Sequence, residues 1–124
     1  MVVCHSLACL LWFRTAGSLA RIDRLPLVAP PASNRVPEAG ASFRLGAFDA
    51  AAVRSSVRGE IRIACSDADP YNPEGAQAAY GTALGVTADV IAGAGHVTPE
   101  SGYGPWPYAE AWCTGEPLRA PSRR

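Results

Sequence analysis

Three short stretches of the 124-residue chain hold side chains that could act together in catalysis. Ser6 follows an apolar run, Asp67 and Asp69 follow a second one, and His96 ends a glycine-rich turn after a third. A serine hydroxyl is a weak nucleophile at neutral pH, so it needs a neighbouring base, and the base needs a group that orients it. The order serine, acid, histidine supplies these groups and predicts nucleophilic catalysis by Ser6.

Ser6 must lie on a sharp turn between a strand and a helix if its hydroxyl is to be exposed. Such a turn brings the residues two before and two after the serine close together, so both must be small. Cys4 and Ala8 occupy these positions. The next backbone N–H, that of Leu7, would then point at the substrate oxygen as an oxyanion donor. A serine that begins an ordinary buried helix is the alternative interpretation.

Two acids compete for the role of orienting the base. Asp69 stands directly before Pro70, in a turn that can aim its carboxylate at a histidine. Asp67 is also suited to an Asx turn that starts the following helix. His5 is the only other histidine, and its side chain should point to the opposite side of its strand from Ser6. We therefore interpret His5 as a packing or supporting residue.

Predicted strands and helices alternate along the chain. Strands are predicted at 1–5, 25–29, 60–65 and 86–91, with Pro26 marking the start of the second. Helices are predicted at 7–19, 48–57, 73–84 and 105–113, and a loop at 30–46. Pro73 suits the first turn of its helix and Gly85 its C-terminal cap, while Trp106 and Trp112 should anchor the last helix. This alternation predicts an α/β fold with a parallel sheet of about four strands and helical crossovers.

Composition narrows the classes of partner and compartment. The net charge is zero, which gives no electrostatic reason to expect binding to nucleic acid or to an anionic membrane. The N-terminal apolar run lacks a preceding basic residue, so we do not expect a signal peptide. The four cysteines form no disulfide framework, and Cys4, Cys9 and Cys65 should be buried, reduced thiols of a cytoplasmic protein. A zinc site at Cys4, His5 and Cys9 lacks the usual paired spacing, and no cofactor is expected.

Five stretches of the chain resemble the serine hydrolase family that includes retinoblastoma-binding protein 9 and the YdeN-type bacterial proteins. Residues 3–8 (VCHSLA) are similar to its Ala-His-Ser-Leu-Gly elbow, and residues 27–31 (LVAPP) to its next strand. Residues 66–71 (SDADPY) are similar to its Ser-x-Asp-Asp-Pro-Tyr turn. Residues 93–97 (GAGHV) and 100–107 (ESGYGPWP) are similar to its histidine loop and the segment after it.

This resemblance implies an α/β-hydrolase in which Ser6 is the nucleophile, Asp69 the acid and His96 the base. The implied substrate is a small ester or related acyl compound. The resemblance also implies that residues 1–113 are the C-terminal portion of the domain, and residues 114–124 are expected to form a disordered tail. The strands before the elbow and a second oxyanion donor would then be missing, which would impair activity. The alternative function is that of a non-catalytic protein-interaction module. The exposed sheet edge also offers a surface for self-association.

Overall fold

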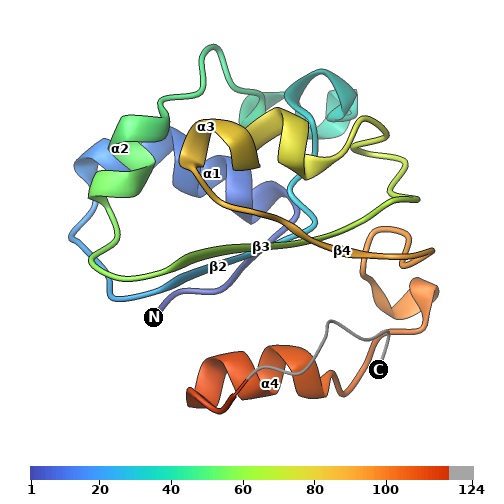
Figure 1. Ribbon diagram of the computed structural model, residues 1–124. Coiled ribbons are helices and arrows are strands. Elements are labelled where there is room, and N and C mark those ends of the chain that lie inside the picture. Colours follow the sequence, from blue (N-terminus) through green and yellow to red (C-terminus); the bar gives the residue numbers. More distant parts are fainter. Residues whose placement is uncertain (118–124) are drawn as a thin grey trace.

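The computed structural model describes residues 1–117, which form a four-stranded parallel sheet in the order β1-β2-β3-β4 (Figure 1). The strands are β1 (Cys4–His5), β2 (Leu25–Val28), β3 (Ile61–Ser66) and β4 (Asp89–Ile91). Each strand pairs in parallel with the next one along the chain. The predicted fold class, a parallel α/β sheet of about four strands, is confirmed.

Helices cover both faces of the sheet. On one face lie α1 (Leu7–Thr15), α2 (Ala50–Ser55) and α3 (Thr82–Leu84), while α4 (Pro107–Thr114) lies on the other (Figure 1). A π-helical turn at Gln77–Gly81 leads directly into α3. Short 3₁₀ turns occupy Ala16–Ser18, Ser33–Arg35, Glu38–Phe43 and Pro99–Ser101.

The main core lies between the sheet and α1 and α2. Successive strand residues point to opposite faces, so Leu25, Leu27 and Ile63 face the same helices. These three side chains pack in one cluster with Leu10 of α1 and Val53 of α2, and all five are fully buried. Burying an aliphatic side chain of this size stabilises the fold by about 1.5–3 kcal/mol. This core holds β1 and α1, and therefore Ser6, in a fixed position.

A smaller cluster lies under the other face. Tyr108 and Trp112 of α4 are buried and pack against Ala64 of β3. Trp106, which the sequence predicts as a second anchor, is partly buried beside them. The helix begins at Pro107 and ends at Thr114, and Gly115 follows it in a left-handed conformation. Thr114 therefore belongs to α4, and residues 118–124 of the predicted tail lie outside the described residues.

The limits of several predicted elements differ from those observed. The helices predicted at 48–57 and 105–113 are Ala50–Ser55 and Pro107–Thr114, and the strands predicted at 1–5 and 86–91 are Cys4–His5 and Asp89–Ile91. Two further helices differ for local reasons. The first ends at Thr15 and not at Leu19, because Gly17 and Ser18 favour a tighter 3₁₀ turn over a regular helix. The third begins near Gln77, and Pro73 lies in a turn before it, so the prediction that Pro73 occupies its first turn is wrong. Gly85 ends that helix with φ +69°, as predicted.

Pro26 lies inside β2, which has neighbours on both sides, although proline is disfavoured in inner strands. The direction in which the missing N–H would point explains this. The Leu25 N–H donates to the Glu60 carbonyl on the β3 side (3.0 Å), so the next residue, Pro26, faces β1. β1 only begins at Cys4, which pairs with Leu27. Pro26 therefore lies just outside the assigned pairs of β1 and β2, although the Val2 N–H still donates to the Arg24 carbonyl at 3.2 Å.

Candidate active site

Ser6 occupies a strained turn between β1 and α1. Its backbone has φ +56° and ψ −124°, a region that side chains with a Cβ rarely adopt. The Ser6 N–H donates to the Val28 carbonyl (2.9 Å), and the Ser6 carbonyl accepts from the Cys9 N–H (2.9 Å). The Ser6 side chain makes no capping hydrogen bond to α1. These features exclude an ordinary helix N-cap and leave the hydroxyl directed away from the helix.

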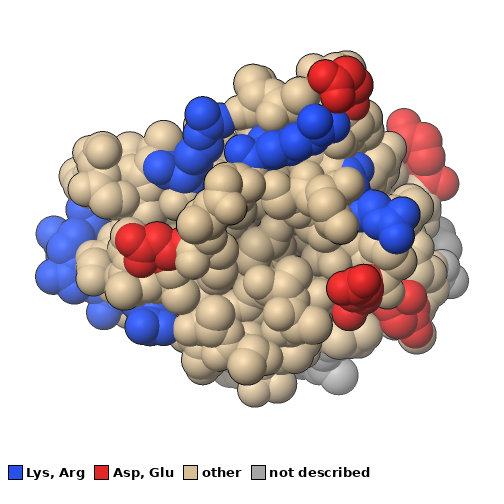
Figure 2. Space-filling view, turned by 90° about the horizontal axis from the view of Figure 1, so that it is seen from above, with Lys and Arg blue, Asp and Glu red and all other residues tan. Residues whose placement is uncertain are grey.

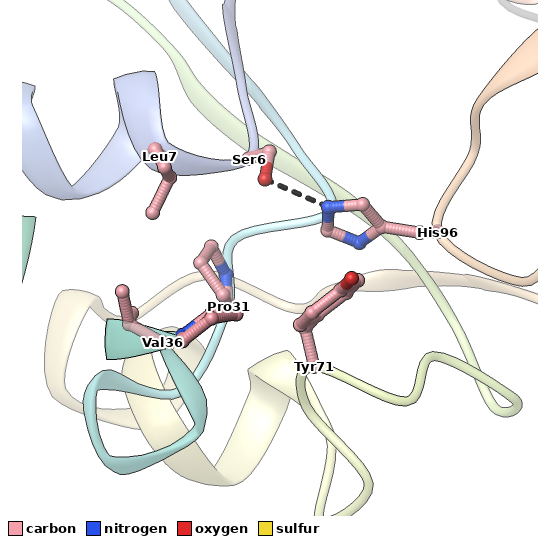
Figure 3. Close-up of a pocket in the computed structure, with 7 residues that line it drawn as sticks. Ser6, Leu7, Pro31, Val36, Tyr71 and His96 are labelled. Carbon is pink, nitrogen blue, oxygen red and sulfur yellow. Dashed lines mark hydrogen bonds between the residues drawn. The ribbon is translucent and has the colours of Figure 1, made fainter. Parts of the chain in front are cut away.

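The hydroxyl of Ser6 meets the imidazole of His96. Ser6 Oγ lies 2.7 Å from His96 Nε2, as the dashed line in Figure 3 marks. His96 follows β4 on a loop in which Gly95 has φ +58° and Val97 has φ +52°. A Cβ on Gly95 would lie 2.6 Å from Ser101 Oγ, so this position requires glycine both for its backbone and for its packing. The loop thus carries His96 back over the end of the sheet.

Asp69 holds the other side of the same imidazole. Its Oδ2 and Oδ1 lie 2.9 and 3.0 Å from His96 Nδ1. The Asp69 side chain is 2% exposed and that of His96 is 14% exposed, so water screens the pair little. A carboxylate only accepts hydrogen bonds, which places the ring proton on Nδ1 and leaves Nε2 free to accept from Ser6. Asp69 also accepts from the Tyr71 N–H (2.9 Å), which orients the carboxylate.

The residue types alone left two candidate acids, and the family resemblance implied Asp69. Asp67 is exposed, and its Oδ1 accepts from the Gly93 N–H at 2.7 Å. Asp67 therefore ties the end of β3 to the start of the loop that carries His96. Asp69, and not Asp67, contacts the imidazole.

His5 supports this arrangement from the neighbouring position. Its Nε2 lies 3.0 Å from the backbone oxygen of His96, and since a carbonyl only accepts, His5 is the donor. The two histidine rings lie 5.3 Å apart, and the ring of Tyr71 lies 4.7 Å from that of His96 on centroid distance. Sequence reasoning identified His5 as a supporting residue without its contact, because only the folded loop brings residue 96 beside residue 5.

A cavity of about 270 Å³ opens beside these groups. All residues that line it within residues 1–117 are uncharged. They are Ser6, Leu7, Pro31, Val36, Pro37, Tyr71 and His96 (Figure 3). Leu7 is the first residue of α1, so its N–H has no carbonyl partner within the helix and is available at the cavity. Sequence reasoning missed Val36 and Pro37, because it treated 30–46 only as a loop.

One comparison with known proteins identifies the family of this chain. A family model described as serine hydrolase matches residues 1–114, nearly the whole chain. The chain belongs to the serine hydrolase family. Neither the curated proteins nor the solved structures contain a significant match to this serine hydrolase. Hydrolysis is therefore the general activity that family membership supports for the chain.

Three of the four cysteines of this serine hydrolase pack in its core. Cys4, Cys9 and Cys65 are buried and Cys113 is exposed, and each is a free thiol. Burial raises the pKa of the Cys9 thiol well above its ordinary value, and it raises the pKa values of Cys4 and Cys65 as well. These thiols therefore stay protonated and unreactive at neutral pH. Within residues 1–117, His, Cys, Asp and Glu side chains form no group of three that could hold a metal ion.

Charges of both signs are dispersed over the face of the serine hydrolase that carries α1, α2 and α3. Arginines and acidic residues lie around the rim in Figure 2, and neither sign forms a continuous patch on this face. One ion pair joins Arg44 and Glu38, with 3.2 Å between Nη2 and Oε2. Among residues 1–117, every helix falls short of the length and apolar character that a membrane crossing requires.

Proposed function

We propose that this serine hydrolase cleaves small carboxylic esters, with Ser6 as nucleophile, His96 as general base and Asp69 as the acid that orients it. One observation carries the proposal: a continuous series of contacts runs from Ser6 Oγ through both ring nitrogens of His96 to the Asp69 carboxylate. Nucleophile, base and orienting group within hydrogen-bond reach of one another are the geometric signature of an activated serine.

The proposed reaction proceeds in two halves. Ser6 Oγ attacks the ester carbonyl carbon while its proton moves to His96 Nε2, and the carbonyl oxygen becomes an oxyanion close to the Leu7 N–H. When the C–O bond to the alcohol breaks, His96 gives that proton to the departing oxygen, which leaves an acyl group on Ser6. Water then attacks the acyl carbon with His96 again as base, and the carboxylic acid and free Ser6 are released.

Asp69 contributes through the protonated form of His96. The imidazolium that exists during both halves carries a positive charge in a poorly solvated place. The buried carboxylate of Asp69 stabilises that charge and keeps the ring from rotating away from Ser6. The Tyr71 N–H contact to Asp69 supports this by fixing the carboxylate.

A fluorophosphonate probe tests this function, because it reacts with activated serines. We expect the wild-type chain to be labelled at Ser6 and to hydrolyse p-nitrophenyl acetate. Ser6→Ala should abolish both, while Ser55→Ala, at an exposed serine of α2, should change neither. Absence of labelling in a folded wild-type sample would refute the function for this chain.

A second candidate is a non-catalytic module that associates through β1 with a second copy of the chain. Its support is the position of β1 at the edge of the sheet, where Met1 and Val3 are 44% and 49% exposed. An edge strand offers unpaired peptide groups to another chain. Light scattering should then report a dimer or larger species and no turnover, whereas an active monomer contradicts this candidate.

Two finer assignments belong to the same proposal. The segment 100–107 supports placing the chain near retinoblastoma-binding protein 9 and the YdeN-type proteins within the family. The four free thiols support action in the cytoplasm, where thiols remain reduced. Labelling the cysteines of freshly purified, unfolded protein with a thiol reagent should find all four reactive, and a disulfide would contradict the location.

A further inference from the structure

We propose that the cavity beside Ser6 receives a short, uncharged, aliphatic acyl group, and that Val36 sets the maximum length of that group. The inference rests on the proposed esterase function and deepens it. It follows from which end of the ester faces the cavity, from the chemistry of the walls, from their volume and from the rigidity of the wall at Val36.

The position of the base decides which end of the substrate faces which wall. His96 must protonate the leaving oxygen, so the alcohol part of the ester lies on the His96 side of Ser6. Figure 3 shows Leu7 and Val36 on the opposite side of Ser6 from His96, with Pro31 near Val36. The acyl chain, which points away from the leaving group, therefore extends toward Leu7, Pro31 and Val36.

The walls on that side favour a neutral hydrocarbon chain. Leu7, Pro31, Val36 and Pro37 are apolar, and every lining residue within the described part of the chain is uncharged. A carboxylate on the acyl chain would lose its hydration without gaining a charged partner, which is unfavourable. A hydrocarbon chain would be removed from water at the same place, which is favourable.

The volume sets the approximate chain length. The cavity of about 270 Å³ is small, because pockets that bury drug-sized ligands have volumes of about 300–1,000 Å³. The ester carbonyl and the first atoms of the alcohol also take up part of it, which leaves room for a short acyl chain. Acyl groups from butanoyl to hexanoyl should therefore fill the cavity, and octanoyl or longer ones should meet its far wall.

That wall is held in place from several directions. The Val36 carbonyl accepts from Nε and Nη2 of Arg44 at 3.2 and 2.8 Å, and Val36 is 3% exposed. Gly40 lies directly behind it, since a Cβ on Gly40 would be 3.2 Å from Val36 Cγ1 and 3.4 Å from Leu7 Cδ1. The Ala32 N–H donates to the Tyr71 carbonyl at 2.9 Å, which joins the start of this segment to the turn that carries Asp69. Val36 can therefore act as a steric limit.

The test measures kcat/KM for p-nitrophenyl esters from acetate to decanoate and for the hemisuccinate, which carries a negative charge at the chain end. We expect kcat/KM to be highest between butanoate and hexanoate and to fall about tenfold or more by decanoate. We expect kcat/KM for the hemisuccinate to be about 100-fold below that for butanoate, which is in the range of discrimination that apolar pockets provide. Val36→Ala should move the maximum to longer chains, and Val36→Phe should move it toward acetate. Val90→Ala, at an exposed position of β4, should leave the profile unchanged.

A flat profile, a preference for decanoate or hemisuccinate, or an unchanged maximum in both Val36 variants would overturn the inference. Failure of the inference is distinguishable from failure of the function. An enzyme that is labelled at Ser6 and hydrolyses all chain lengths equally keeps the proposed function and refutes the pocket. The wild-type profile itself does not depend on the folding of any variant. Competition between the probe and n-alkyl boronic acids of increasing length should give the same maximum without turnover.

Discussion

Replacing Asp69 by asparagine tests the tautomer argument directly. The change keeps the size of the side chain but exchanges one accepting oxygen for an NH₂ donor. The Tyr71 N–H, 2.9 Å from Oδ1, keeps an oxygen at that position. The new NH₂ group then takes the place of Oδ2, which lies 2.9 Å from His96 Nδ1. The retained Oδ1 also lies 3.0 Å from Nδ1, but the nearer position then holds a donor, which favours the ring form with its proton on Nε2 and removes the ability to accept from Ser6.

The expected loss is about 10⁴-fold in kcat, which is the effect of the same change in the Ser-His-Asp template. It corresponds to about 5 kcal/mol of lost transition-state stabilisation. Hydrolysis of p-nitrophenyl butanoate measures it, and circular dichroism checks that the variant is folded.

Asp67→Asn is the matched control. Its remaining oxygen can still accept from the Gly93 N–H, so we expect less than about a threefold change, because surface substitutions of this kind have small effects. The reasoning is refuted if Asp69→Asn keeps activity within tenfold of the wild type, or if Asp67→Asn is the more damaging change.

Three further changes have defined outcomes. Gly95→Ala should lower the free energy of unfolding by about 1–2 kcal/mol, because φ is +58° at this position. Gly104→Ala, with open space around it, should leave the free energy of unfolding unchanged. Urea unfolding measures both variants, and equal stabilities would contradict the argument. The pKa of Tyr108 is raised to about 12, mainly by burial and secondly by its hydrogen bond with a carboxylate. The folded state therefore keeps a proton that the unfolded chain loses near pH 10. Stability should therefore fall between about pH 10 and 12, and Tyr108→Phe should flatten this fall in a series of thermal melts. His5→Ala should reduce kcat by about tenfold at most, since the hydrogen bond that it removes contributes about 0.5–1.5 kcal/mol, and a loss near that of Ser6→Ala would give His5 a direct chemical role.

The fold was largely predictable because its signals are local. Buried parallel strands have continuous apolar runs, and the runs before Ser66 and around Leu25 therefore identify β3 and β2. Limits of helices were less predictable. Pro73 has the right residue type for a first helical turn, yet the chain forms a turn there and begins its helix later. Competition between such local preferences is settled by packing against the rest of the molecule.

The candidate site divides in the same way. Ser6 and His96 stand out in the sequence because an apolar strand precedes each of them. The residue types alone left Asp67 and Asp69 as candidates, since both follow β3 within three residues, and the family resemblance implied Asp69. The cavity wall at Val36 had no sequence signal, because a loop of Pro, Ser, Gly and Ala does not indicate what it will cover.

The sequence by itself determined the order of the elements, the family and the residues able to do the chemistry, because strands, turns and short motifs depend on neighbouring positions. Tertiary structure alone decided which atoms meet. Ser6 and His96 are 90 positions apart, and their contact at 2.7 Å exists because parallel pairing of four strands brings the carboxyl ends of β1, β3 and β4 to one edge. The contact of Asp69 with the His96 ring and that of His5 with the His96 backbone are consequences of that convergence.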